Sequence, residues 1–334
     1  MVDPSSVRAV RSRLAIAALG TYAPEKRLTN DDLAKLVDTT DEWIVSRTGM
    51  RERRIAREDE FTSDLCLGAV RDLESRGGSL DGVDYVIACT VTPDYQFPSV
   101  AARLQDVLGL QNVGAIDLGA ACAGFVYGLD LADSLVSTGR ARKVLVAAGE
   151  TLSKITDYRD RSTCILFGDG AGAALVTADG AGGDGMLLAR RVNSDGASGR
   201  ELFATGLRKE IAGTVDPEPY LRQNGRAVYE WALTNVSAGI GQLLRSAELR
   251  AADVDWFVPH SANGRMIESI CKRTGIPREK TLTSFELHGN TSSASIPLAL
   301  APAVADGRVK RGDTVLLYGF GGGLVECGML LRWA

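Results

Sequence analysis

Two stretches of the chain repeat the same succession of apolar and polar segments. An apolar run at residues 84–88 and another at residues 255–259 each follow a short turn and precede a segment with helical periodicity. Further apolar runs at residues 144–149 and 315–319 follow a second helical segment, and equivalent features are separated by nearly the same interval along the chain. Near-continuous apolar strands that alternate with helices predict buried, mostly parallel sheets covered by helices. A twofold repeat of that unit predicts an α/β protein built from two similar half-domains.

The repeat also suggests where the half-domains begin and end. We expect them to span residues 1–180 and 181–334. Residues 178–225 are rich in glycine and aspartate and have weak periodicity, so we interpret them as a connection with loops suited to covering a pocket. We expect the four helical segments to end at glycines, at positions 109 and 139 in the first half and 275 and 307 in the second.

Cys122 is the residue most suggestive of chemistry. It lies where an apolar run meets a cluster of small residues, and Phe125, Leu129 and Val136 follow it at helical spacing. We therefore predict that Cys122 is the first residue of a helix, where backbone N–H groups and the helix dipole favour a thiolate. The alternative is a buried structural cysteine, the usual state of a free cysteine. We assign that alternative to the other five: Cys66, Cys89, Cys164, Cys271 and Cys327.

Composition and charge exclude several classes of protein. The 334 residues are 45% hydrophobic and carry a net charge of −4, which is typical of a globular protein and gives no overall basic field for nucleic acid. No apolar run approaches the length of a membrane span. The cysteines and histidines lack metal-ligand spacing, so we expect no metal. Arginines before a short apolar stretch at residues 14–19 faintly resemble a signal peptide, but we favour a cytoplasmic protein with reduced thiols.

Only two histidines are available as partners for a cysteine nucleophile. His260 ends an apolar strand and, by the repeat, lies at the same sheet edge as Cys122. A lone histidine is more often structural, but this symmetry favours a catalytic role. The interval between the glycines at 139 and 307 also separates Cys122 from Asn290, so we expect Asn290 to occupy the equivalent place in the second half. His288 flanks this second site and is expected to position backbone.

A glycine run at residues 319–323 follows one of the apolar strands. It lacks the Lys and Ser/Thr of a P-loop. Glycines allow close approach of the backbone and positive φ, so the run fits a backbone amide aimed at an oxyanion.

Six segments together carry a family resemblance that runs in order from about residue 14 to residue 333. The chain resembles β-ketoacyl-acyl-carrier-protein synthase III. The resemblance implies a thiolase-like fold (a five-layered αβαβα sandwich), a homodimer and a catalytic site formed by Cys122, His260 and Asn290. The matching segments are residues 39–53, 119–125, 167–172, 258–263, 288–295 and 319–323.

The resemblance also implies a reaction, which initiates fatty acid biosynthesis without a metal or redox cofactor. The Cys122 thiolate attacks an acyl-CoA, and the backbone N–H groups of Cys122 and Gly322 form the oxyanion hole. Malonyl-acyl-carrier protein then loses CO₂, and the side chains of His260 and Asn290 stabilise the enolate. The resulting carbanion attacks the acyl-Cys122 carbonyl.

Contacts to coenzyme A follow from the resemblance rather than from the residues alone. Without it, Trp43 and the basic cluster at residues 47–57 would be interpreted as a solvated face with one half-buried aromatic. The implied contacts are Trp43 and Arg161 on the adenine, Arg47 on a phosphate, and Gly225 and Asn263 on the pantetheine arm.

Two further surfaces are predicted. Arg265, Lys272 and Arg273 fall on one helix face, suited to docking an acidic carrier protein. In the family, positions equivalent to Phe97 and Phe167 line the acyl pocket, and Phe97 reaches across from the other subunit; both could equally be core residues.

Departures from the family pattern leave alternatives open. Ser261 stands where many members have Gln, and residues 324–328 replace a commoner Leu-Thr-Trp-Gly, which puts acyl specificity in doubt more than reaction type. The variant motifs resemble a second-copy subgroup, some members of which accept branched starters. The rival hypotheses are a thiolase-fold acyltransferase that acts on an alcohol or amine without decarboxylation, and a non-catalytic partner that binds acyl chains or carrier protein. Biosynthetic thiolase is disfavoured because its second cysteine precedes the glycine run, whereas Cys327 follows it.

Overall fold

Two main sheets organise the molecule. The computed structural model describes residues 12–178 and 186–334. One sheet has the order β1-β7-β6-β4-β5, and the other has the order β13-β14-β15-β8. The predicted division between residues 180 and 181 lies outside the described residues. The strands of the first sheet are β1 (Leu14–Tyr22), β4 (Tyr85–Cys89), β5 (Gly114–Leu118), β6 (Lys143–Thr151) and β7 (Asp169–Ala178). Those of the second are β8 (Leu187–Ser194), β13 (Trp256–Pro259), β14 (Thr314–Gly321) and β15 (Val325–Arg332).

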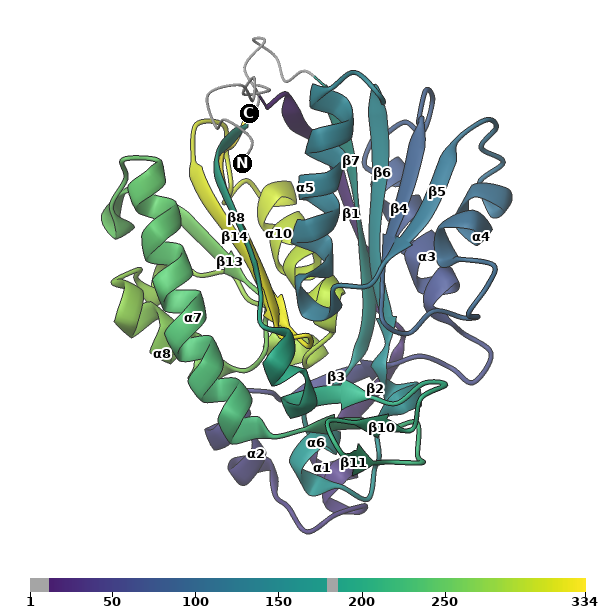
Figure 1. Cartoon of the computed structure of the whole chain (residues 1–334), viewed down its shortest axis with the longest axis vertical. Coiled ribbons are helices and arrows are strands. Elements are labelled where there is room, and N and C mark those ends of the chain that lie inside the picture. Colours follow the sequence, from purple (N-terminus) through teal and green to yellow (C-terminus); the bar gives the residue numbers. More distant parts are fainter. Residues whose placement is uncertain (1–11, 179–185) are drawn as a thin grey trace.

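Helices cover both faces of each sheet, which gives five layers (Figure 1). Alternate residues of a strand face opposite layers, as in β6, where Val144 and Val146 pack on the central helices and Leu145 packs on the outer ones. The thiolase-like αβαβα sandwich is therefore confirmed. The central layer holds α5 (Gly124–Ser137) and α10 (Ser295–Ala305). The outer layers hold α3 (Thr62–Ser75) with α4 (Val100–Val107), and α7 (Gly225–Ser246) with α8 (Gly264–Thr274).

The internal repeat is real, but its true offset is slightly longer than the predicted one. Strands β4 and β13 begin at residues 85 and 256, β6 and β14 at residues 143 and 314, and α5 and α10 at residues 124 and 295, so one constant interval relates all three pairs. All four predicted helix-ending glycines have positive φ, between 66° and 75°. Helix α10, which ends before Gly307, is shorter than α5, which ends before Gly139, so counting from these two glycines makes the offset too short. The residue equivalent to Cys122 is consequently Ser293, and the predicted equivalence with Asn290 is wrong.

The connection between the sheets contains more structure than its composition predicted. Residues 187–194 form β8, an outer strand of the second sheet that pairs with β15. Residues 202–204 then pair with residues 221–223, and residues of both of these strands line the cavity described below. A short hairpin at residues 210–215 lies between them in the chain. The remaining elements are β2 (Lys26–Thr29), β3 (Glu52–Ile55), β9 (Leu202–Ala204), β10 (Glu210–Ile211), β11 (Thr214–Val215), β12 (Leu221–Gln223), α1 (Asn30–Ala34), α2 (Asp41–Thr48), α6 (Arg161–Cys164) and α9 (Phe285–His288). Within the described ranges, each helix is too short or too polar to cross a membrane.

Candidate active site

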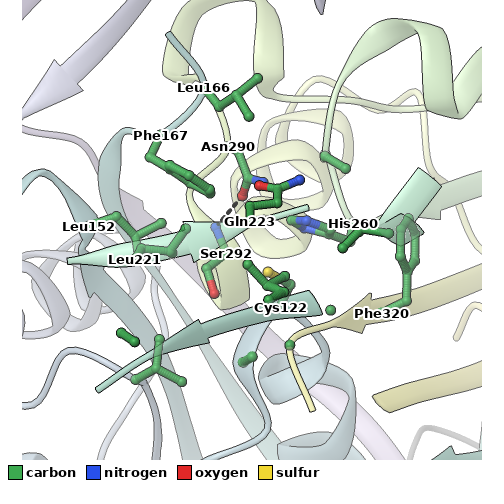
Figure 2. A pocket seen from close by; sticks show the side chains of 18 of the residues that line it. Cys122, Leu152, Leu166, Phe167, Leu221, Gln223, His260, Asn290, Ser292 and Phe320 are labelled. Atoms are coloured by element: carbon green, nitrogen blue, oxygen red, sulfur yellow. Dashed lines mark hydrogen bonds between the residues drawn. The ribbon is translucent and has the colours of Figure 1, made fainter. Parts of the chain in front are cut away.

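A cavity of about 290 Å³ opens at the strand ends between the two halves. Cys122 comes from the first half, and His260 and Asn290 come from the second; all three line this cavity, with Ser292 beside them (Figure 2). The rest of the wall is largely apolar and includes Leu152, Leu166, Phe167, Leu202, Leu221 and Phe320. Polar groups that converge in an apolar pocket are typical of an active site.

Cys122 lies one turn before the helix that the sequence predicted it would begin. It occupies a 3₁₀ turn at Ala121–Ala123, and α5 starts at Gly124. The backbone amides of Cys122 and Gly322 and the Ser292 hydroxyl lie close to its sulfur and act to lower the pKa of the thiol. Burial outweighs these contacts and, with Glu150 nearby, raises the pKa of the Cys122 thiol to about 12. The expected thiolate is therefore wrong for this state of the protein, because the side chain is only 8% exposed.

The end of β14 approaches Cys122 so closely that only glycine fits. A Cβ atom on Gly321 would lie 2.7 Å from the Cys122 Cβ and 2.9 Å from its Sγ. This contact brings the neighbouring Gly322 amide to the sulfur. The glycine run therefore serves as backbone scaffolding beside the thiol, as its sequence suggested.

His260 is fixed in the wall of the cavity by three contacts. Its backbone N–H donates to the Tyr318 carbonyl at 2.8 Å, and its ring packs edge-on against Phe320 at 5.3 Å between centroids. Its Nδ1 lies 2.8 Å from Ser295 Oγ, which accepts a hydrogen bond from the Ser261 backbone N–H at 3.2 Å. Burial lowers the pKa of His260 to about 3, so its ring is neutral at physiological pH.

The backbone of Asn290 is clamped by a loop from the other half of the chain. Its N–H donates to the Leu166 carbonyl at 2.8 Å, and its carbonyl accepts from the Gly168 N–H at 3.0 Å. Its Oδ1 accepts from the Ser292 N–H at 2.9 Å, and the side-chain NH₂ remains for the cavity (Figure 2). Preceding it, Gly289 has φ 66°, and a Cβ there would lie 2.8 Å from the Leu166 carbonyl oxygen.

Of the five residues predicted to bind coenzyme A, Asn263 alone lines the cavity. Arg161 and Arg47 both pack over the Trp43 ring, at 5.1 and 5.7 Å, so an adenine between Trp43 and Arg161 requires Arg161 to move. Asn263 lines the cavity and caps α8 by accepting from the Met266 N–H. Gly225 is exposed at the start of α7 and does not line the cavity.

The three basic residues predicted to dock the carrier protein lie in two different environments. Arg265 and Lys272 line a groove between α2 and α8, which Arg278 also lines. Lys272 forms an ion pair with Glu268 at 2.8 Å in the same groove. Arg273 instead donates to the Leu233 carbonyl of α7, although its side chain is exposed.

The two phenylalanines predicted for the acyl pocket have opposite environments. Phe167 is 4% exposed and lines the cavity. Phe97 is 84% exposed and is not part of the cavity of its own chain. Its placement is compatible with a role in a second subunit, which stays a prediction.

Several residues at or near the site were not singled out by the sequence. Gln223, at the end of β12, points its amide toward Asn290 and His260 (Figure 2). Ser292 and Ser295 lie within a matched motif, yet nothing in one sequence distinguishes their contacts. His288 was expected to position backbone; its side chain lines a separate cavity of about 200 Å³, where its Nδ1 has no hydrogen-bond partner within the described residues.

The departures from the family pattern form packed contacts behind the site. Ser261 Oγ accepts from the Ser284 N–H at 2.9 Å. Glu326 is fully buried and binds Arg191 at 3.0 Å, and its other oxygen accepts from the Tyr318 hydroxyl at 3.0 Å. Cys327 is also buried, and all six cysteines are free. In the described part of the chain, no cluster of three or more His, Cys, Asp or Glu side chains could hold a metal ion.

Comparisons with known proteins place the chain among the thiolase-fold acyltransferases. Residues 116–196 match the family model for 3-oxoacyl-[acyl-carrier-protein (ACP)] synthase III, and residues 244–333 match that for its C-terminal part. Proteins named β-ketoacyl-[acyl-carrier-protein] synthase III 2 from Halalkalibacterium halodurans and Bacillus subtilis are each 55% identical over 324 residues. These alignments cover 96% of this chain and 97% and 99% of the relatives.

The solved structures lead to the same family. A β-ketoacyl-[acyl carrier protein] synthase III from Thermus thermophilus matches with a TM-score of 0.92 and 44% identity, over 96% of this chain and 99% of that one. The chain therefore belongs to the β-ketoacyl-acyl-carrier-protein synthase III family, whose condensing acyltransferases initiate fatty acid biosynthesis.

Proposed function

We propose that this chain condenses an acyl-CoA starter with malonyl-acyl-carrier protein through an acyl-Cys122 intermediate. One observation carries this proposal: Cys122, His260 and Asn290, which are far apart in sequence, line a single cavity in a chain of this family. Cys122 supplies the nucleophile, and the other two supply hydrogen-bond donors. No metal or redox group is needed for either half of the reaction.

Acylation begins when the Cys122 sulfur attacks the thioester carbonyl. The oxygen of the tetrahedral intermediate gains negative charge, and the backbone N–H groups of Cys122 and Gly322 are its donors in this proposal. Both amides lie close enough to the sulfur to lower the pKa of the thiol, which supports their placement at the reacting centre. Removing one such donor typically raises the activation free energy by about 3 kcal/mol.

Condensation requires a stabilised enolate after malonyl-acyl-carrier protein loses CO₂. Ser295 Oγ accepts from the Ser261 N–H, which leaves its own proton for Nδ1 of His260. The neutral imidazole then carries its proton on Nε2 and can donate it to an oxygen in the cavity. The NH₂ group of Asn290 is the second donor, and the carbanion attacks the acyl-Cys122 carbonyl.

The partners and location of the enzyme belong to the same proposal. We infer that Arg265, Lys272 and Arg273 attract an acidic carrier protein, and that Trp43, Arg47, Arg161, Gly225 and Asn263 lie along the coenzyme A path. A homodimer is supported by the exposed Phe97, and six free thiols are typical of a cytoplasmic protein.

Intact-mass spectrometry tests the proposal directly. The protein is incubated with straight and branched acyl-CoAs, and malonyl-acyl-carrier protein is then added. We expect a mass gain of one acyl group on Cys122, followed by its discharge into a β-ketoacyl-carrier protein. Cys122→Ala abolishes the gain, whereas the matched variant Cys271→Ala, in the α8 cluster away from the cavity, retains it.

The other outcomes separate the rival hypotheses. An acyl-enzyme that malonyl-carrier protein fails to discharge, but an alcohol or amine does, identifies the non-decarboxylating transferase. No acylation by any acyl-CoA contradicts both enzymatic functions and favours the binding partner.

A further inference from the structure

A carboxylate that the proposed reaction does not use lies just behind the cavity. Glu150 is on β6 and is 0% exposed. Its Oε2 accepts hydrogen bonds from Thr90 Oγ1 at 3.0 Å, the Val91 N–H at 3.1 Å and Thr92 Oγ1 at 2.8 Å. These partners are neutral, so hydrogen bonds rather than a cation compensate for its burial.

The second oxygen of Glu150 connects the carboxylate to the nucleophile. Its Oε1 lies 3.0 Å from the hydroxyls of both Ser292 and Ser293. The Ser292 hydroxyl also lies close enough to the Cys122 sulfur to lower the pKa of the thiol, whereas Ser293 Oγ turns to the Cys89 carbonyl at 3.0 Å. A continuous path of polar groups therefore runs from the thiol through the Ser292 hydroxyl to Glu150.

The single proton of the Ser292 hydroxyl makes this path directional. When Glu150 is ionised, Ser292 must donate to it, and its oxygen can accept only from the thiol S–H. When Glu150 is protonated, Ser292 can donate to the sulfur and stabilise a thiolate. The proton on Glu150 and the thiolate on Cys122 thus favour one another.

His260 is poorly suited to accept the thiol proton. Its Nδ1 is held by Ser295, and its burial disfavours the imidazolium. The other titratable side chains near Glu150 are Cys66 and Cys89, and burial raises the pKa of both thiols. Burial also raises the pKa of Glu150 itself, which makes it a better proton acceptor.

We propose that Glu150 takes the proton of the Cys122 thiol through the Ser292 hydroxyl. The thiol proton moves to Ser292 Oγ as the original hydroxyl proton moves to Glu150 Oε1, which leaves a thiolate and a neutral carboxylic acid with the total charge unchanged. The thiolate is acylated, and the departing coenzyme A thiolate takes a proton from solvent. When condensation later expels the Cys122 thiolate, the proton returns along the same path. This proposal rests on the proposed function, because it needs Cys122 as the nucleophile.

The pH profile of Cys122 alkylation by iodoacetamide tests the relay without any substrate. In wild type the reactive form holds the same number of protons as the resting form, so we expect the rate to change less than about threefold between pH 6 and 8. In Glu150→Gln and Ser292→Ala the proton must leave to solvent, and the rate should rise about tenfold per pH unit. Peptide mass spectrometry confirms the site of alkylation.

Ser293→Ala is the matched control, since it removes a hydroxyl from Glu150 but leaves the path through Ser292. It should keep the flat profile. The relay is overturned if wild type already rises tenfold per unit and Glu150→Gln has the same profile. It is also overturned if Glu150→Gln reacts faster at every pH, because a carboxylate that acts only by its charge would suppress the thiolate.

Folding of each variant is checked by its thermal transition. If only one of Glu150→Gln and Ser292→Ala folds, that variant alone is sufficient to test the relay.

Failure of the relay is distinguishable from failure of the proposed function. A chain that is acylated by acyl-CoA but has no flat profile retains its function and lacks the relay. A chain with a flat profile that no acyl-CoA acylates has the relay and another substrate.

Discussion

Burial governs the ionisation of both histidines. It lowers the pKa of His260 to about 3, and it lowers that of His288 to about 4 with help from the nearby Arg54. In the unfolded chain each imidazole titrates near pH 6.5. Folding therefore favours the neutral ring of both residues. This preference lowers the free energy of unfolding only at pH values where the imidazoles of the unfolded chain are protonated.

Acidification should destabilise the protein well before its carboxylates titrate. Below about pH 6.5 the unfolded state binds protons that the folded state rejects, so the free energy of unfolding falls as the pH falls toward 4. Between pH 7 and 5 we expect each histidine to contribute a loss of roughly 2 kcal/mol. Urea denaturation of wild type and His288→Gln at both pH values measures it.

The His288→Gln variant serves as its own control, since only the change with pH matters. Its loss of stability between pH 7 and 5 should be smaller than that of wild type by the contribution of one histidine. Equal losses in the two proteins would show that His288 titrates normally in the folded state.

At this scale the sequence identified the candidate nucleophile but not its environment. Cys122 could be predicted from the small residues around it, because their size is a local property. Its pKa could not, because burial depends on Gly321 and Phe320, which come from the other half of the chain. Glu150 and Ser292 are far apart in sequence, and no local pattern predicts the hydrogen bond between them.

The end of strand β14 is the element on which the geometry of the thiol depends. A methyl group on Gly321 would overlap the Cys122 side chain, and neither partner is a flexible surface group. We expect Gly321→Ala to displace Cys122 from the Gly322 amide and to slow acylation on the order of 100-fold, as misplacing a reacting group typically does. The acylation rate is measured by quenching the reaction at successive times and determining the intact mass of the protein.

A second glycine substitution separates this effect from a general intolerance of alanine. Gly241 lies inside α7, and a Cβ there meets only the flexible end of Arg245. Gly241→Ala should acylate at the wild-type rate and stabilise the protein by roughly 0.5–1 kcal/mol. Normal acylation by Gly321→Ala would contradict the role assigned to this strand end.

The order of helices and strands was predictable where apolar runs are continuous and glycines mark the ends of helices. Strands β4, β6, β13 and β14 and the ends of their helices follow the predicted pattern. The prediction of mostly parallel sheets is wrong, because each main sheet also contains two antiparallel strand pairs. Strand β8 was missed because it is a half-exposed outer strand in a region rich in glycine and aspartate. Asn290 was placed correctly at the second site but by a wrong equivalence, since the helices of the two halves differ in length.

The candidate catalytic residues come from both halves of the molecule, and one wall of their cavity is partly exposed to solvent. Val91 lines the cavity yet is 41% exposed, and the segment after it carries Tyr95 and Phe97 into solvent. The neighbouring β5 is an edge strand of the first sheet, with Ile116 36% exposed. Exposed apolar side chains beside an unpaired strand edge favour association with a second copy.

We expect the protein to be a dimer at micromolar concentration, with Phe97 of each chain buried against its partner. Burying each of the two equivalent side chains stabilises the interface by about 2 kcal/mol, so Phe97→Ala, which alters both, should weaken dimerisation on the order of 1000-fold. If Phe97 also closes the wall at Val91, the variant will change which acyl-CoA acylates Cys122 fastest. Analytical ultracentrifugation and an acyl-CoA competition measure the two effects. Leu207→Ala, which alters an 86% exposed side chain elsewhere, should change neither. A wild-type monomer that is fully active would show that each chain completes its cavity alone.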